Sequence, residues 1–326
     1  MVSPQVYRFS LAYRPIFEVA CPVLCVVGII SNCLNILIFS KKKMKSPINV
    51  LLCWLAAADG LTMISVLTHN IQYRRLNKYY GGSLSTIQIV LVCVNSSVLF
   101  HSIAMWLAVA LALFRSLIVF FPFRAGRLCT VKKVHITSVT ISILMSAVAI
   151  PNMYVNTIQS YSFTIDNTTM NWYFINLRSD SLFNLNIVLH SVACKLLPCV
   201  LLLVLNGVLI QGMRQAKRRH LQLTGGTSNQ SAHSNRTDNK SGSTGMLVAV
   251  VTLSIITETP QAVMMFWSRF DQEVKTLYTL QGDPFVTLTI INSSINFLLY
   301  CTMSSTFRKA VINIMRSSVN PRLWFA

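Results

Sequence analysis

Seven long apolar runs constrain the fold of this 326-residue chain more than any other feature. A helix needs about 20 apolar residues to cross a hydrocarbon core of roughly 30 Å. Only 11% of the residues are charged and 53% are apolar, which is too little charge to cover a soluble domain. The sequence therefore predicts an all-α membrane protein, a seven-transmembrane helix bundle, with spans near residues 16–40, 47–71, 85–119, 133–154, 183–213, 246–267 and 284–303.

The segments between these spans are mostly too short to hold another domain. We expect a short N-terminal segment (1–15), one membrane domain (16–303) and a C-terminal tail (304–326). The first apolar run is longer than that of a signal peptide, so we expect it to insert uncleaved. The stretch 221–245 is rich in Ser, Thr, Asn and Gly, which predicts a flexible loop.

The net charge of +19 is divided unequally between the two sides of the predicted bundle. With the N-terminus outside, eighteen Lys and Arg residues and one acid fall on the cytosolic side, against eight cations and five acids outside. This is the positive-inside pattern, so we expect an extracellular N-terminus and a cytosolic C-terminus. Because the basic segments flank membrane spans, they indicate topology and attraction to anionic membrane lipid, and we expect no nucleic-acid partner.

Other protein classes find little support in the sequence. The nine cysteines lie in spans or toward the cytosol, without the spacing of a metal site, so we expect no metal, no cofactor and no outer disulfide. No nucleophile–base set or phosphate loop indicates an enzyme. Buried Lys195 and Glu258 would suit a transporter or channel. The odd number of spans and the lack of an inverted repeat argue against that class.

The connection between spans four and five, about 155–182, contains two β-prone runs around a polar turn. This pattern predicts a β-hairpin over the extracellular mouth of the bundle. Asn167 begins a glycosylation sequon in that turn, so we expect a glycan there.

Burying an ionisable side chain inside a membrane span costs free energy, so each such residue indicates either a functional role or a specific structural partner. Asp59 has no way to reach water from the middle of span two. Arg115, near the cytosolic end of span three, has a structural alternative, since a long side chain can reach the interface. A satisfied interior histidine is likewise an alternative for His101. Prolines that permit kinks lie in three spans, at Pro151, Pro198 and Pro260.

The chain resembles the rhodopsin-like (class A) G-protein-coupled receptors over nearly its full length. The motifs that carry the resemblance each lie in the proper span. They are Gly28–Asn32, Leu55–Asp59, Leu113–Ser116 followed by Pro122 and Phe123, Pro198, Pro260, Asn296–Tyr300, and Phe307–Arg308 at the start of an expected amphipathic eighth helix.

Departures from the common class A motifs indicate which branch of these receptors the chain resembles. Phe114 replaces the usual acid before Arg115, Ser116 replaces the usual Tyr, and Phe297 replaces a proline. Span six reads Thr-Glu-Thr-Pro-Gln around Glu258. These features are similar to the myosuppressin and FMRFamide-like peptide receptors and to the related Srw chemoreceptors.

The resemblance implies roles at the cytosolic side. Arg115 would cap the cavity that opens for a heterotrimeric G protein, and Tyr300 would swing toward it on activation. Pro122 and Phe123 would contribute to G-protein coupling. Lys240 replaces the acid that often pairs with the Arg, so we expect no inactive-state ion lock.

The resemblance also implies a polar core between the spans. Many relatives hold sodium at the position of Asp59, but Ala104 stands where they usually have serine, which argues against the ion here. The core residues would be Asn32, Asp59, Asn292, Ser293 and Asn296.

The expected ligand site lies nearer the outside. Ser97 occupies the position of the acid that binds amines in biogenic-amine receptors, so an amine ligand is not expected. His101, Lys195 and Glu258 would meet at the cavity floor, and a Lys195–Glu258 pair would be either a switch or a fixed structural pair. Further contacts to a peptide would come from Gln261, Trp172, Tyr173, Asp271 and Asp283.

The leading interpretation is a multi-pass plasma-membrane receptor for a short extracellular peptide. The acidic residues on the outer side would attract an arginine of that peptide. The alternative is a chemosensory receptor of the same fold for a small environmental molecule. Cytosolic partners would be a heterotrimeric G protein, and also an arrestin and a receptor kinase.

Overall fold

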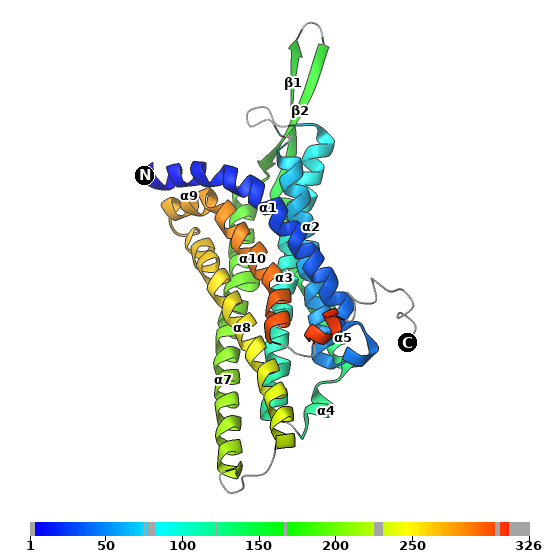
Figure 1. The fold of residues 1–326 in the computed structure, drawn as a ribbon. Coiled ribbons are helices and arrows are strands. Elements are labelled where there is room, and N and C mark those ends of the chain that lie inside the picture. The colour runs from blue at the N-terminus through cyan, green and yellow to red at the C-terminus, as the bar shows by residue number, and fades with distance from the viewer. Residues whose placement is uncertain are drawn as a thin grey trace, which may run out of the picture.

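The computed structural model describes residues 4–74, 76, 82–121, 123–165, 168–224, 231–303 and 307–312. Within this part of the chain, seven helices are long and apolar enough to cross a membrane, which confirms the predicted number of spans. Figure 1 shows them packed as one bundle. The spans are α1 (Pro4–Phe39), α2 (Pro47–Tyr73), α3 (Leu84–Phe120), α5 (Val131–Val155), α6 (Asp180–Leu189) continued by η2 (His190–Leu196) and α7 (Leu197–Thr224), α8 (Ser231–Trp267) and α10 (Gly282–Met303).

Short polar side chains begin several of these helices. Ser46 precedes Pro47, and its hydroxyl accepts a hydrogen bond from the backbone N–H of Asn49. Ser83 and Thr130 cap α3 and α5 in the same way. Each cap satisfies a backbone donor that the first turn leaves free, so each fixes where its span starts. The described parts of the connections contain three short helices, namely η1 (Lys42–Met44), α4 (Ala125–Leu128) and α9 (Gln272–Leu280).

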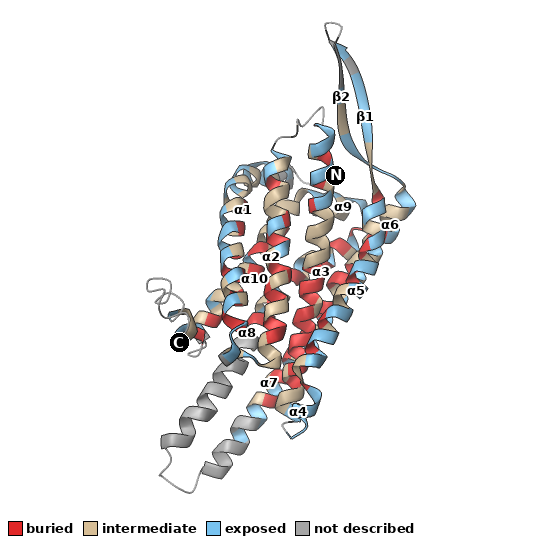
Figure 2. Ribbon diagram, turned by 90° about the vertical axis from the view of Figure 1, so that its right-hand side faces the viewer, coloured by how far each residue is buried: buried red, intermediate tan, exposed pale blue. Residues whose placement is uncertain are grey.

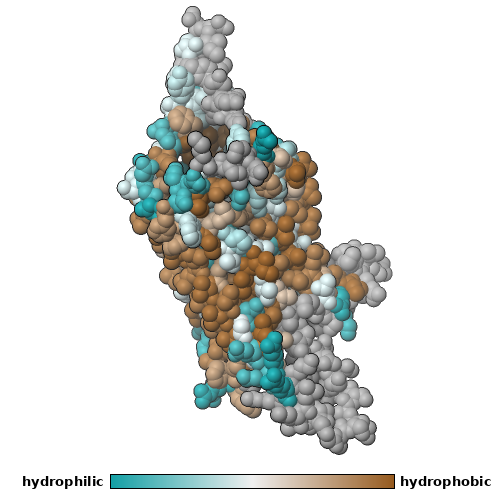
Figure 3. Space-filling view, turned by 90° about the vertical axis from the view of Figure 1, so that its left-hand side faces the viewer, coloured by the Kyte–Doolittle hydropathy of each residue, from teal (hydrophilic) through white to brown (hydrophobic). Residues whose placement is uncertain are grey.

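The centre of the bundle is α3, which packs against α2, α5 and α7. Of its most apolar stretch 61% is buried, against 22% for α5, so α3 is interior and α5 peripheral (Figure 2). Small buried residues at Ala104, Ala108 and Ala112 let neighbouring helices approach closely. Figure 3 shows apolar side chains over much of the middle of the face in view, as suits contact with lipid tails. Large apolar side chains such as Val92 and Leu203 are exposed.

The predicted hairpin is present. Strands β1 (Asn156–Ile165) and β2 (Thr168–Leu177) pair antiparallel, and Figure 1 shows the hairpin rising away from the bundle. At its base Gly82 and Tyr173 exchange both backbone hydrogen bonds, at 3.1 and 3.0 Å. The nine cysteines are free thiols, so no disulfide holds the hairpin. This backbone bridge connects it to the segment before α3. We call the end of the bundle with the hairpin and α9 the hairpin end.

Helices extend further than the sequence suggested. α1 begins at Pro4, so most of the expected N-terminal segment continues the first span; Figure 1 shows it lying across the hairpin end. α7 runs to Thr224 and α8 begins at Ser231, so helix extends into part of the stretch 221–245, which we expected to be a flexible loop. A helix that continues from a span needs no new nucleation, which offsets weak local propensity. Residues 307–312 are helical, and the rest of the expected eighth helix lies outside the described residues.

Candidate functional site

Lys195 and Glu258 form a buried ion pair between the fifth span and α8, as the sequence predicts. Lys195 Nζ lies 2.6 Å from Glu258 Oε2, and the two residues are 4% and 0% exposed. A single charge at this depth would pay the full cost of leaving water, so each charge depends on the other.

Three further side chains complete this site. Lys195 Nζ also lies 2.8 Å from His101 Nε2 and 3.0 Å from Gln261 Oε1. Nε2 of His101 lies 3.1 Å from Glu258 Oε2 as well, so this nitrogen contacts both members of the ion pair, accepting from Lys195 in one tautomer and donating to Glu258 in the other. Thr289 donates to Glu258 Oε1 at 3.4 Å. We call these five residues the buried cluster.

A local widening of the fifth span presents Lys195. His190–Leu196 form a π-helix, in which an N–H bonds to the carbonyl five residues earlier, as Leu197 does to Val192. The next bond in this register would join Pro198 to Ala193, but proline has no N–H. Nε1 of Trp106 donates to that carbonyl instead, at 3.0 Å. Trp106 therefore satisfies the backbone group that the proline leaves unpaired beside the buried cluster.

The predicted polar core forms around Asp59. The Oγ of Ser293 donates to Asp59 Oδ1 at 2.8 Å, and Nδ2 of Asn296 donates to Oδ2 at 3.2 Å. Asn32 joins the group through its donor to the backbone oxygen of Ser293, at 3.2 Å. Three spans, α1, α2 and α10, are thereby linked through buried side chains.

These residues do not fit a sodium site well. Both carboxylate oxygens of Asp59 already accept protein hydrogen bonds, and buried Ala104 offers no hydroxyl. Asn292, expected in the same core, instead accepts from Ser254 Oγ at 3.1 Å and links α10 to α8.

Tyr300 lies at the other end of the polar core from the buried cluster along α10. It is 2% exposed and packs edge-on against Phe39 and Phe307, with ring centroids 5.4 and 5.6 Å away. Such packing in an aromatic box gives the ring one well-defined position in this state.

Arg115 and Phe123 lie at the end of the bundle opposite the hairpin. Arg115 is half-buried on α3, between the buried residues Phe114 and Ser116. Phe123, just after α3, is fully exposed. Pro122 lies outside the described residues.

The family of this chain follows from comparison with known proteins. Residues 18–318 match the family described as serpentine type 7TM GPCR chemoreceptor Srw. The chain belongs to this family of G-protein-coupled receptors. It is thus a multi-pass plasma-membrane protein, and the receptor class expected from its motifs is confirmed.

Three relatives are similar to this receptor over most of its length. Sex peptide receptor-related protein 2 of Caenorhabditis elegans is 27% identical, covering 88% of this chain and 68% of the relative. The sex peptide receptor of Drosophila melanogaster is 26% identical, covering 90% and 71%. The FMRFamide receptor of Drosophila melanogaster is 22% identical, covering 89% of this chain and 52% of the relative.

The remaining predicted ligand residues of the receptor lie apart from one another. Ser97 precedes His101 by about one turn of α3 and donates to the backbone of its own helix. Trp172 and Tyr173 are in β2. Asp271 caps α9 by accepting from two backbone N–H groups, which gives it a structural role. Asp283 lines a cavity at the hairpin end. Asn167, the predicted glycan site, lies outside the described residues.

Some connecting residues were not found from the sequence. Thr289 and Trp106 escaped notice because neither carries a charge inside its span. Asn152 donates to Asn95 and accepts from Asn186, both at 2.8 Å, and so joins three spans. Asparagines in apolar runs were the available signal, because each such side chain needs a buried partner.

Proposed function

We propose that the receptor is activated from outside the cell by a short peptide, of the kind that ends in Arg-Phe-amide. The relatives named as sex peptide and FMRFamide receptors support a peptide ligand. The observation that carries the mechanism is the buried cluster, whose ion pair and hydrogen bonds join α3, the fifth span, α8 and α10.

The hairpin end faces outward in this proposal. The charge distribution supports this orientation, because the basic segments that follow spans one, three, five and seven lie toward the opposite end. The peptide reaches the bundle beside the hairpin, where Trp172 and Tyr173 offer aromatic contacts. Its amidated end lies toward Ser97, His101 and Gln261.

The buried cluster is the element that senses the ligand. A carboxamide oxygen competes with Gln261 for one hydrogen of Lys195, since that hydrogen bond, at 3.0 Å, is longer than the ion pair. Nδ1 of His101, buried without a partner among the described residues, offers the ligand a second polar atom. The ligand thereby changes the balance of contacts between the fifth span and α8.

Such a change shifts a pre-existing equilibrium between inactive and active bundles. In the active state the packing of Tyr300 against its aromatic neighbours changes and the bundle opens around Arg115. Exposed Phe123, with Pro122, contacts the heterotrimeric G protein. An arrestin and a receptor kinase use the same end, whose basic residues also attract anionic lipid.

A second candidate is a chemosensory receptor for a small molecule. The observation in its favour is the chemoreceptor description of the family to which the chain belongs. The same buried cluster then contacts a small polar molecule instead of a peptide end.

The test is G-protein activation in transfected cells by a library of amidated peptides. Arg115→Ala is the inactive variant, and Lys132→Ala, an exposed cation on α5, is the matched control. A saturable response that Arg115→Ala abolishes at normal surface expression, and that Lys132→Ala retains, supports the proposal. Silence across the library with the receptor at the surface favours the chemosensory alternative.

A further inference from the structure

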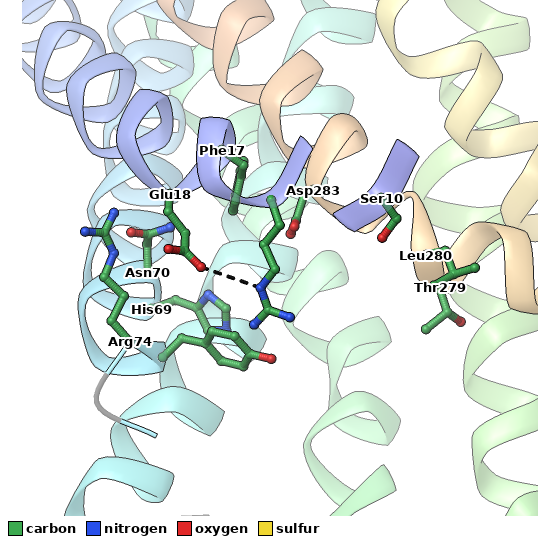
Figure 4. Close-up of a pocket in the computed structure, with 11 residues that line it drawn as sticks. Ser10, Phe17, Glu18, His69, Asn70, Arg74, Thr279, Leu280 and Asp283 are labelled. Carbon is green, nitrogen blue, oxygen red and sulfur yellow. Dashed lines mark ion pairs between the residues drawn. The ribbon is translucent and has the colours of Figure 1, made fainter. Parts of the chain in front are cut away.

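A cavity of about 370 Å³ opens at the hairpin end, between α1, α2, α9 and α10. Its volume falls within the range of about 300–1,000 Å³ typical of small-ligand sites. Its walls include an aromatic surface and two carboxylates (Figure 4). The residues on which the argument depends are Arg14, Glu18, His69, Tyr73 and Asp283. None of them belongs to the buried cluster.

A guanidinium from the receptor itself already lies in this cavity. Arg14 Nε is 3.5 Å from Glu18 Oε1, and Arg14 Cζ lies 5.4 Å from the ring centroid of Tyr73. The Tyr73 ring stacks in turn on His69, at 5.6 Å between centroids. A carboxylate and an aromatic face are the two surfaces that a guanidinium prefers. The cavity is therefore shaped to accept this cation.

Arg14 is partly exposed to water. The side chains of Arg14 and Glu18 are 41% and 43% exposed, and exposed pairs of this kind contribute little. Tyr73 and the charge of Asp283 also attract Arg14, so an incoming cation displaces it by making the same contacts. Arg14 is also carried by the part of α1 that precedes Pro15, where a proline removes a helix hydrogen bond.

Asp283 provides a second carboxylate. It lies in the first turn of α10, and within the described part of the chain no cation lies within 4.0 Å of its carboxylate. Tyr13 donates to Thr287 at 2.9 Å, and Thr287 donates to the backbone oxygen of Asp283, so the position of this turn relative to α1 is fixed. Figure 4 shows Glu18 and Asp283 on either side of the ion-paired guanidinium, with Arg74 beyond Glu18 on the left in that view.

We propose that this cavity is a ligand subsite for a cationic group of the activating peptide, and that Arg14 occupies it as a displaceable substitute in the unliganded receptor. The inference rests on the proposed peptide-receptor function. The incoming cation pairs with Asp283 and Glu18 and covers the Tyr73 ring. The cation is either an arginine guanidinium or the peptide amino terminus, and both carry the charge that the two carboxylates recognise.

The test uses the peptide Phe-Met-Arg-Phe-amide, its citrulline analogue, which lacks the guanidinium charge, and its N-acetyl analogue, which lacks the terminal charge. Each is titrated on wild-type receptor and on the Asp283→Asn, Glu18→Gln and Arg14→Gln variants, with surface expression measured in parallel. On wild-type receptor, removing the recognised charge is expected to lower potency about tenfold. In Asp283→Asn and Glu18→Gln this ratio falls to about threefold or less, whereas Arg14→Gln makes the parent peptide several-fold more potent because no substitute competes.

The outcomes separate the two proposals. Citrulline sensitivity that disappears in Asp283→Asn assigns the subsite to arginine, and N-acetyl sensitivity that disappears assigns it to the amino terminus. Potency ratios that stay at their wild-type values in both carboxylate variants overturn the subsite while leaving the peptide receptor in place. Wild-type receptor that is present at the surface and silent to the parent peptide overturns the peptide-receptor proposal and this subsite with it.

Discussion

Replacing Glu258 by Gln removes the negative charge of the buried cluster while keeping the size of the side chain. Lys195, 4% exposed, then lacks the carboxylate that faced it at 2.6 Å. Removing one partner of a buried ion pair costs about 3–5 kcal/mol. The hydrogen bonds of Lys195 to His101 and Gln261, at 2.8 and 3.0 Å, remain in the variant. We therefore expect a loss near the lower limit, about 3 kcal/mol.

The measurement is thermal unfolding of the solubilised receptor, together with surface expression. Lys195→Met is expected to destabilise the receptor comparably, because it leaves the Glu258 carboxylate unpaired. The double variant removes both charges, so we expect it to recover most of the stability that each single variant loses. The matched control is Glu18→Gln, the same substitution in an exposed ion pair, with an expected cost of about 1 kcal/mol or less.

Two readings of the pair differ in the agonist response of the double variant. A fixed structural pair predicts that the double variant regains both surface expression and response. A switch predicts that it regains expression but has altered basal activity or agonist potency. A Glu258→Gln receptor with wild-type stability, expression and response would refute both, since the pair would then contribute to neither folding nor signalling.

Two further predictions concern single contacts. Trp106→Phe removes the donor to the carbonyl of Ala193, and we expect it to lower the free energy of unfolding by about 1–3 kcal/mol in a thermal-stability assay. The control Trp54→Phe loses an exposed hydrogen bond and should cost less. Equal losses would contradict the idea that Trp106 satisfies a carbonyl left free by the π-helix. Phe123→Ala should leave stability unchanged, because the ring is fully exposed, yet weaken G-protein activation. The control is Phe121→Ala, at a neighbouring exposed ring. Full activation by the Phe123→Ala receptor would exclude a contact between Phe123 and the G protein.

The resemblance motifs located much of the site because buried polar groups require partners. Asp59 in an apolar span had to find donors, and it finds them in Ser293 and Asn296. Lys195 and Glu258 each needed an opposite charge, and the span in which each lies left few choices. Asn292 shows the limit of this reasoning. The sequence placed it in the polar core around Asp59, whereas in the structure it accepts a hydrogen bond from Ser254 of α8.

The sequence by itself determined the number of spans and the hairpin, because span length, apolar composition and β-prone runs around a turn are properties of local segments. The family motifs placed His101, Lys195 and Glu258 together, and only the tertiary structure decided that Gln261 and Thr289 also contact the ion pair. The indole of Trp106 reaches Ala193 because a π-helix and a proline leave one carbonyl free. Likewise, Arg14, Tyr73 and Asp283 come from three helices, and only the packing of those helices creates a cavity between them.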